Sequence, residues 1–179
     1  MIRVGLVGTG GMGTVHYNNY QHIDGCKVVA LVGITPQSQD CAEKWGLPLY
    51  DTITSMAAGE QVDVADICSP TFLHKDHVME ALSNDLHAIT EKPAALHRND
   101  AEEMFTLAEE KGKFLFVAQV LQFTREVEIL RTLVKSEEYG KPLDAFFERL
   151  SARPRWVQNG WLFEKEKSGL LPFDLHIHD

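Results

Sequence analysis

Residues 7–13 read VGTGGMG, and this stretch decides the fold. It carries the spacing G-x-G-x-x-G, directly after an apolar run and directly before a run of helical character. In that position Gly8 permits a tight turn, Gly10 lets the backbone approach a pyrophosphate, and Gly13 allows close packing of helix on strand. The helix N-terminus then offers unpaired N–H groups to the phosphates. The residues that we expect to bind a dinucleotide here are Gly8, Thr9, Gly10, Gly11, Met12 and Gly13.

Short apolar runs alternate with helical patterns through residue 118. Such runs suit strands that are buried on both faces of a sheet. The clearest helical pattern is Asp100–Lys111, with an N-cap at Asn99 and a stop at Gly112. This alternation predicts an α/β fold, a Rossmann-type doubly wound parallel sheet with right-handed crossovers. The expected strands are Ile2–Val7, Lys27–Val32, Pro48–Tyr50, Val62–Ile67, Leu86–Thr90 and Lys113–Ala118.

The pattern changes after about residue 120. We therefore divide the chain into a dinucleotide-binding domain, residues 1–120, and the beginning of a substrate and dimerisation domain, residues 121–179. Thr124–Lys135 is predicted to be a helix, and Pro142–Ser151 a strand of alternating character. These residues are too few to complete a second sheet, so we expect an incomplete α+β domain. A strand without partners exposes its edges and an apolar face, which predicts a homo-oligomer.

Composition narrows the possible partners. The net charge of −9 argues against nucleic acid or an anionic membrane as the main partner. Cys26, Cys41 and Cys68 lie far apart without CxxC spacing, so we expect reduced thiols and a cytoplasmic protein. We identify neither a signal peptide nor a membrane-spanning run in the sequence.

The second strand bears on the choice of cofactor. In a Rossmann fold, an acidic residue at the end of the second strand usually binds the ribose hydroxyls. Here the strand ends in Gly33, Ile34 and Thr35, without an acid and without a basic residue for a 2′-phosphate. The neutral Thr35 could serve either cofactor. The prediction is therefore NAD or NADP, with the preference left open.

Three further stretches resemble the Gfo/Idh/MocA family, named for glucose–fructose oxidoreductase and inositol dehydrogenase. Glu91-Lys92-Pro93 matches the family's EKP motif, and Asp174-x-x-x-His178 matches its D-x-x-x-H motif. The resemblance covers essentially the whole chain. It implies an NAD(P)-dependent dehydrogenase that transfers a hydride to or from a sugar, a polyol or a related hydroxy compound. The stretches are ICSPTFLHKDHVMEAL (67–82), LHAITEKPAAL (86–96) and GLLPFDLHIHD (169–179).

The resemblance also implies roles for single residues. Lys92 would contact the reacting hydroxyl or carbonyl, and Asp174 would orient the substrate. His178 would be the general base or acid, since an unperturbed histidine titrates near neutral pH. The Lys92–Pro93 peptide bond would be cis, and Arg155 and Trp156 would lie in a substrate-side loop. The residues expected beside the cofactor are Ser69, Pro70, Thr71, His74, Glu91 and Lys92.

Other interpretations remain at this point. Lys92 could be a solvated surface lysine, and His74 could pack locally. DLHIHD also resembles a metal-binding D-x-H-x-H strand, but Pro172 suits the first turn of a helix and the metal interpretation needs more ligands. We therefore expect a catalytic helix and no metal. The alternatives are a dinucleotide-binding regulatory or sensor protein without catalysis and an inactive truncated fragment. We expect that this chain by itself is not a working dehydrogenase, because loose placement of His178 lowers the rate.

Overall fold

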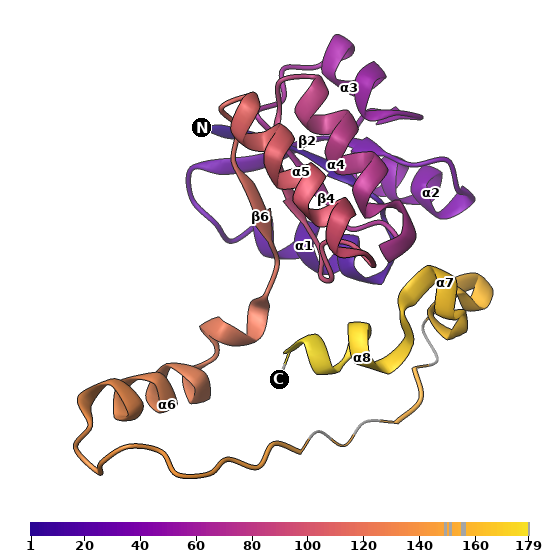
Figure 1. Ribbon diagram of the computed structural model, residues 1–179. Coiled ribbons are helices and arrows are strands. Elements are labelled where there is room, and N and C mark those ends of the chain that lie inside the picture. The colour runs from indigo at the N-terminus through magenta and orange to yellow at the C-terminus, as the bar shows by residue number, and fades with distance from the viewer. Residues whose placement is uncertain (149, 151, 155–156, 179) are drawn as a thin grey trace.

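A single parallel sheet organises the chain. The computed structural model describes residues 1–148, 150, 152–154 and 157–178. Six strands pair in the order β3-β2-β1-β4-β5-β6, as predicted for a Rossmann fold (Figure 1). The strand bounds are β1 Ile2–Val7, β2 Cys26–Val32, β3 Leu49–Tyr50, β4 Val64–Ile67, β5 His87–Thr90 and β6 Leu115–Val117.

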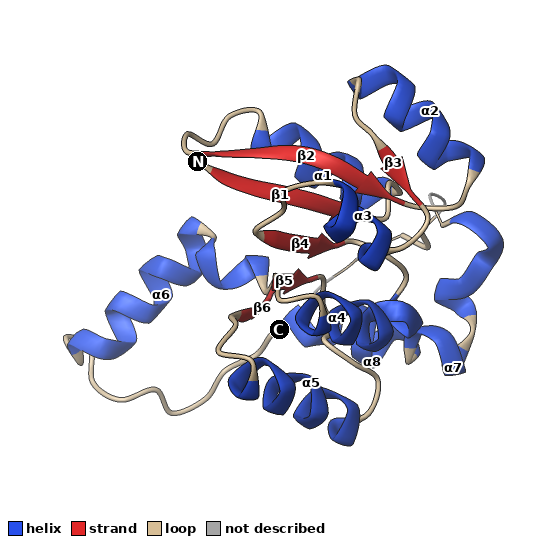
Figure 2. Cartoon of the chain, turned by 90° about the horizontal axis from the view of Figure 1, so that it is seen from above, coloured by secondary structure: helices blue, strands red, loops and turns tan. Residues whose placement is uncertain are grey.

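Helices cover both faces of this sheet (Figure 2). One face carries α1 (Gly11–Tyr20) and α2 (Pro36–Trp45), and the other carries α3 (Ile53–Gly59), α4 (His74–Ser83) and α5 (Arg98–Glu110). The helix predicted from residue 100 begins earlier, because the backbone turns helical at Arg98 and His97 is the N-cap. The predicted stop is confirmed, since Gly112 takes a φ of +61° after the last turn.

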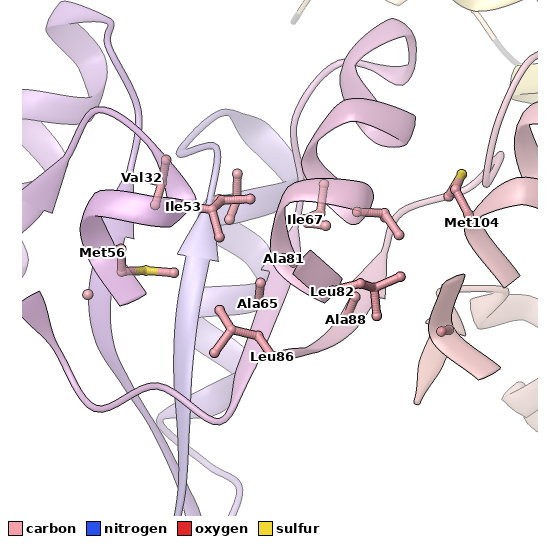
Figure 3. Close-up of a cluster of buried hydrophobic side chains, with 14 residues drawn as sticks. Val32, Ile53, Met56, Ala65, Ile67, Ala81, Leu82, Leu86, Ala88 and Met104 are labelled. Atoms are coloured by element: carbon pink, nitrogen blue, oxygen red, sulfur yellow. The ribbon is translucent and has the colours of Figure 1, made fainter. Parts of the chain in front are cut away.

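Each face has its own apolar core. Toward α3, α4 and α5, Ala65 and Ile67 of β4 pack with Met56, Leu82 and neighbouring side chains (Figure 3). Toward α1 and α2, the core includes other β-strand residues that alternate with the first set, such as Val64 of β4. Asp66 belongs to this second face and is completely buried. An ionisable side chain that is buried in a strand between two layers of helices indicates a charged partner and a candidate functional site.

The glycine turn between β1 and α1 depends on close backbone contact. Gly8 takes a φ of +89°, a conformation that side chains disfavour. A Cβ at Gly13 would overlap the carbonyl oxygen of Gly8, so only glycine lets α1 approach the end of β1. At Gly10 a Cβ would meet no atom within 4 Å. The first and last glycines therefore shape the turn, while the middle one faces open space.

The chain beyond β6 is helical where it is regular. The elements are η2 (Val120–Phe123), α6 (Arg125–Ser136), η3 (Gln158–Phe163), α7 (Lys165–Ser168), α8 (Leu170–Asp174) and η4 (His176–His178). The predicted helix is present as α6, which has no buried residue. After this excursion the chain returns toward the sheet at α8 (Figure 1). The helices in the described part of the chain are all too short or too polar to span a membrane.

The predicted strand Pro142–Ser151 is wrong for the residues that the structure describes. Residues 142–148 and 150 adopt no strand, and positions 149 and 151 lie outside the described residues. Alternating hydrophobicity forms a strand only when a neighbouring strand accepts its hydrogen bonds. Without that neighbour, Leu143, Phe146 and Leu150 are each at least 86% exposed. Because exposed apolar side chains favour association, self-association of the chain stays a prediction.

Alanine substitutions at Gly13 and Gly10 compare a closely packed glycine with an unpacked one in the same turn. We expect Gly13→Ala to lower the free energy of unfolding by about 1–3 kcal/mol, because the new methyl group must displace backbone. Gly10→Ala should change it by less than about 0.5 kcal/mol. Urea unfolding followed by circular dichroism measures both. Equal losses in the two variants would contradict the close approach of Gly13 to Gly8.

Candidate active site at the carboxyl edge of the sheet

Three loops meet where β1, β4 and β5 end. Backbone hydrogen bonds continue the ladder past the strand ends, from Cys68 N to Val7 O (2.8 Å) and from Glu91 N to Ile67 O (2.9 Å). Parallel strands place their carboxyl ends at one edge, where ligands of open α/β sheets bind. The edge thus brings together the glycine turn, the loop that begins at Cys68 and the Glu91-Lys92-Pro93 turn.

The glycine turn fits a phosphate group. Gly10 caps α1 without a side-chain hydrogen bond, and the first turn of α1 contains no acidic residue. No side chain therefore caps the first N–H groups of α1, which begins with Gly11 and Met12, and the space beside Gly10 is open. Thr9 is buried and donates its hydroxyl to Ser38 Oγ at 3.0 Å, so its side chain shapes the turn from within.

Thr35 lies at the expected ribose position and is exposed. Its hydroxyl oxygen accepts a hydrogen bond from Ser38 N at 3.2 Å, which makes it the N-cap of α2. Ser38 is buried and also contacts Thr35 through its hydroxyl at 2.9 Å. No charge of either sign therefore stands at Gly33, Ile34 or Thr35 to select between a ribose hydroxyl and a phosphate.

The loop after β4 is tied to the turn after β5 by His74. This ring is 1% exposed, with Nδ1 2.7 Å from Pro93 O and Nε2 2.9 Å from Ser69 O. Burial lowers the pKa of His74, and a neutral ring donates to one of these two oxygens at a time. Ser69 Oγ is itself hydrogen-bonded to His77 Nδ1 at 2.9 Å. The structure thus agrees with local packing for His74.

Pro70 and Thr71 take the remaining positions of that loop. Pro70 is the N-cap of η1 (Thr71–Leu73), and Thr71 is buried at its first position. They shape the backbone that leads from β4 into α4.

The Glu91-Lys92-Pro93 turn contacts helix α8, near the end of the described chain. The Lys92–Pro93 bond is cis, as predicted. Lys92 Nζ donates to Asp174 Oδ1 at 3.0 Å and to Asp174 O at 2.6 Å. The two side chains are only 14% and 21% exposed. Lys92 is therefore not a freely solvated surface lysine, and two of the three catalytic candidates are in direct contact.

His178 lies outside the helix that was expected to hold it. α8 ends at Asp174, and His178 belongs to the separate 3₁₀ turn η4, where its N–H donates to Leu175 O at 3.1 Å. The prediction of one continuous helix with Asp174 and His178 on a shared face is wrong, because the helix ends between them. The extended strand required by the metal interpretation is also not formed. Arg155 and Trp156 lie outside the described residues.

Sequence reasoning missed a buried polar cluster beside this turn. His16 of α1 donates from Nδ1 to Asp66 Oδ2 at 2.8 Å and from Nε2 to Glu91 Oε1 at 3.2 Å. Cys68 Sγ lies 3.3 Å from His16 Nδ1. The signal that was available is Asp66, an acid within the otherwise apolar strand VADI.

The charges of this cluster follow from its contacts. Burial disfavours a charged ring, but the hydrogen bonds with Asp66, Cys68 and Glu91 outweigh it and raise the pKa of His16 to about 12. Burial also acts against an ionised Glu91, yet the hydrogen bonds from His16 and from Lys92 N lower the pKa of its carboxyl. Burial raises the pKa of the Cys68 thiol to about 12. The cluster thus combines an imidazolium, carboxylates and a neutral thiol.

A known protein family matches the part of the chain that forms the sheet. The model of the Gfo/Idh/MocA oxidoreductase family, described as an NAD-binding Rossmann fold, matches residues 2–119. That range is more than half of the chain.

The chain belongs to the Gfo/Idh/MocA family.

Several relatives of this Gfo/Idh/MocA chain are carbohydrate enzymes. The 2,7-anhydro-N-acetylneuraminate hydratase of Mediterraneibacter gnavus is 27% identical over 97% of this chain and 46% of its own length. The D-glucoside 3-dehydrogenase of Escherichia coli is 30% identical over 99% of this chain and 51% of its own. The WlbA dehydrogenase of Bordetella pertussis, solved with NADH and UDP-GlcNAcA, has a TM-score of 0.73. It is 26% identical over 78% of this chain and 43% of that one. The chain spans about half the length of the curated relatives it matches.

The pH dependence of stability tests the charge on His16. Because its folded pKa is about 12 and its ordinary value is 6.5, the ring stabilises the fold fully below pH 6.5. That contribution is lost as the pH rises toward 12. From about pH 7 to about pH 9, wild type should lose up to about 1.4 kcal/mol of unfolding free energy per pH unit more than the double variant His16→Gln/Asp66→Asn. Urea unfolding measures the slopes.

The paired substitution avoids leaving Asp66 as a buried carboxylate without its cation. His22→Gln, at an exposed position, is the control and should follow the wild-type slope. Parallel slopes for all three chains would show that His16 is not a buried cation.

Proposed function

We propose that this chain is the dinucleotide-binding half of an NAD(P)-dependent dehydrogenase that acts on a sugar, a polyol or a related hydroxy compound. The observation that carries the proposal is the Lys92–Asp174 pair, because Lys92 follows β5 at the same carboxyl edge of the sheet as the glycine turn that follows β1. Membership of an oxidoreductase family and the carbohydrate-related names of the relatives support it. A small molecule, rather than nucleic acid or membrane, is the proposed partner.

The dinucleotide would be held by the residues of the edge. Backbone N–H groups from Gly10 to Gly13 would meet the pyrophosphate at the start of α1. Thr35 would lie toward the adenosine ribose, and Ser69, Pro70, Thr71 and Glu91 would border the nicotinamide, with His74 behind them. When bound, the nicotinamide supplies a hydride acceptor or donor at its C4. We propose either NAD or NADP, since neither an acid nor a base follows β2.

Lys92 would act on the reacting oxygen. An ammonium group that is mostly withdrawn from water stabilises a developing alkoxide more strongly than one in bulk solvent. Asp174 keeps the ammonium in place, because its carboxylate and its carbonyl oxygen both accept from Nζ. We propose that a substrate hydroxyl takes over part of this hydrogen bonding, and that His178 accepts the hydroxyl proton. Lys92, Asp174 and His178 are thus the proposed catalytic group.

We also propose a cytoplasmic homo-oligomer. The supporting observations are the three cysteines without disulfides among the described residues and the apolar side chains exposed on α6 and at Leu143, Phe146, Phe147 and Leu150.

Dinucleotide titration tests the binding half of the proposal. We expect both NADH and NADPH to bind, with affinities that differ by less than roughly tenfold, because no charged residue at the end of β2 discriminates them. Gly10→Ala should weaken binding by roughly tenfold, since its methyl group occupies the space that the pyrophosphate approaches. Nicotinamide fluorescence measures the affinities. Failure of both cofactors to bind at millimolar concentration would refute the proposal.

Isotope transfer tests the chemical half and separates a dehydrogenase from a sensor. NADH deuterated at both C4 positions is incubated with a panel of keto sugars and ketoinositols, and mass spectrometry detects deuterium on the reduced carbon. We expect transfer, however slow, by wild type and its loss in Lys92→Met, which keeps the chain length without the charge. Binding of NADH without transfer to any compound would favour a sensor or an inactive fragment over a dehydrogenase.

A further inference from the structure

The buried cluster around His16 connects three separate parts of the fold. His16 lies in α1, Asp66 lies within β4, and Glu91 directly follows β5. The side chain of His16 is 18% exposed, that of Asp66 is 0% exposed and that of Glu91 is 12% exposed. Both ring nitrogens face carboxylate oxygens, and an ionised carboxylate accepts hydrogen bonds but cannot donate them. Each nitrogen must therefore carry a proton for the two contacts to coexist.

The connection continues from Glu91 to Lys92. One carboxylate oxygen of Glu91 accepts from His16 Nε2 at 3.2 Å, and the other accepts from the backbone N–H of Lys92 at 3.1 Å. A carboxylate whose two oxygens each accept a hydrogen bond is fixed in orientation. The proposed chemistry and dinucleotide contacts do not use His16. Its position on α1 places it on the helix whose first turn faces the proposed phosphate site.

We propose that His16 is a positioning residue: as an imidazolium between Asp66 and Glu91, it ties helix α1 to the Glu91-Lys92-Pro93 turn and fixes the backbone of Lys92. The proposal rests on the proposed function only in giving Lys92 a substrate to meet. The bridge itself is a property of the chain without any ligand.

The groups that face this bridge preserve its charge. Asp66 and Cys68 face the ring from β4 and the residue that follows it, and Glu91 faces it from the end of β5. On the same helix as His16, Tyr20 faces Asp66. Burial raises the pKa of the Tyr20 phenol, and the nearby carboxylate of Asp66 raises it further. Cys68 and Tyr20 therefore stay neutral near neutral pH. A single cation stands between two carboxylates, which favours the doubly protonated ring.

Two substitutions distinguish a bridge from a space-filling ring. The amide of Gln in His16→Gln reaches the place of Nε2, so it can still donate to Glu91. The shorter amide of Asn in His16→Asn reaches only the place of Nδ1, so it can donate to Asp66 but not to Glu91. If the ring positions Lys92 through Glu91, Asn should disturb Lys92 more than Gln, although Asn and Gln are both neutral and polar.

Nuclear magnetic resonance of the ligand-free chain provides the test. In wild type, both ring nitrogens of His16 should carry protons from about pH 6 to about pH 9. The backbone amide and the ε-methylene signals of Lys92 should move clearly in His16→Asn, stay near wild type in His16→Gln and not move in the control His22→Gln. The remaining amide signals report whether each variant keeps the fold.

Three results would overturn the inference. They are a neutral His16 ring near pH 7, equal displacement of Lys92 in the Asn and Gln variants, and no displacement in either. If His16→Asn does not fold, the ring spectrum of wild type and the Lys92 amide of Glu91→Gln, which should move, decide instead. Because no dinucleotide is present, a failure of NADH to bind would reject the proposed function and leave the bridge standing.

Discussion

The backbone ladder that joins β1 to β4 and β4 to β5 is the constraint on which the site depends. It continues one residue past the strands, through Cys68 N to Val7 O and Glu91 N to Ile67 O. Loops that would otherwise be independent are thereby held at a common edge. The glycine turn adds a second constraint, because Gly13 approaches the carbonyl oxygen of Gly8 too closely for any side chain. Together they fix the start of α1 relative to the ends of β4 and β5.

The Glu91-Lys92-Pro93 turn is then held from three directions. His16 holds the carboxylate of Glu91, His74 contacts the carbonyl of Pro93, and Asp174 holds the ammonium of Lys92. The contacts of Glu91 with His16 and of Lys92 with Asp174 join opposite charges, so breaking either is costly, because the remaining partner is left without its counter-charge. Such a turn can keep a lysine aligned without contributing to the apolar core. This is the arrangement that electrostatic catalysis requires, since preorganised charge need not reorient during reaction.

Much of the fold could be predicted from the sequence, because its signals are local. The glycine spacing predicted the β1–α1 turn, and apolar runs predicted all six strands to within a few residues. Pro142–Ser151 failed because period-two alternation describes a strand only where another strand lies beside it, and the described residues have none. The helical break between Asp174 and His178 was equally hidden, since motif spacing does not report where a short helix ends.

The site was less predictable, because its partners are far apart in the sequence. His16 is separated from Asp66 by 50 residues and from Glu91 by 75, and no spacing rule joins them. Lys92 and Asp174 are 82 residues apart, and only the family resemblance brought both into one hypothesis. Asp66 within an apolar strand was the local sign of the cluster. Its partner could be found only once the fold brought His16 of α1 to Asp66 in β4 and to Glu91 after β5.

We propose above all that a dinucleotide bound at the start of α1 places its nicotinamide beside Lys92. Intermolecular nuclear Overhauser effects between bound NADH and the labelled chain test this most directly. The account predicts contacts from the nicotinamide C4 protons to the Lys92 side chain, and none from the adenine protons to Lys92. Nicotinamide contacts confined to residues near Thr35, with adenine beside Lys92, would reverse the orientation and contradict it.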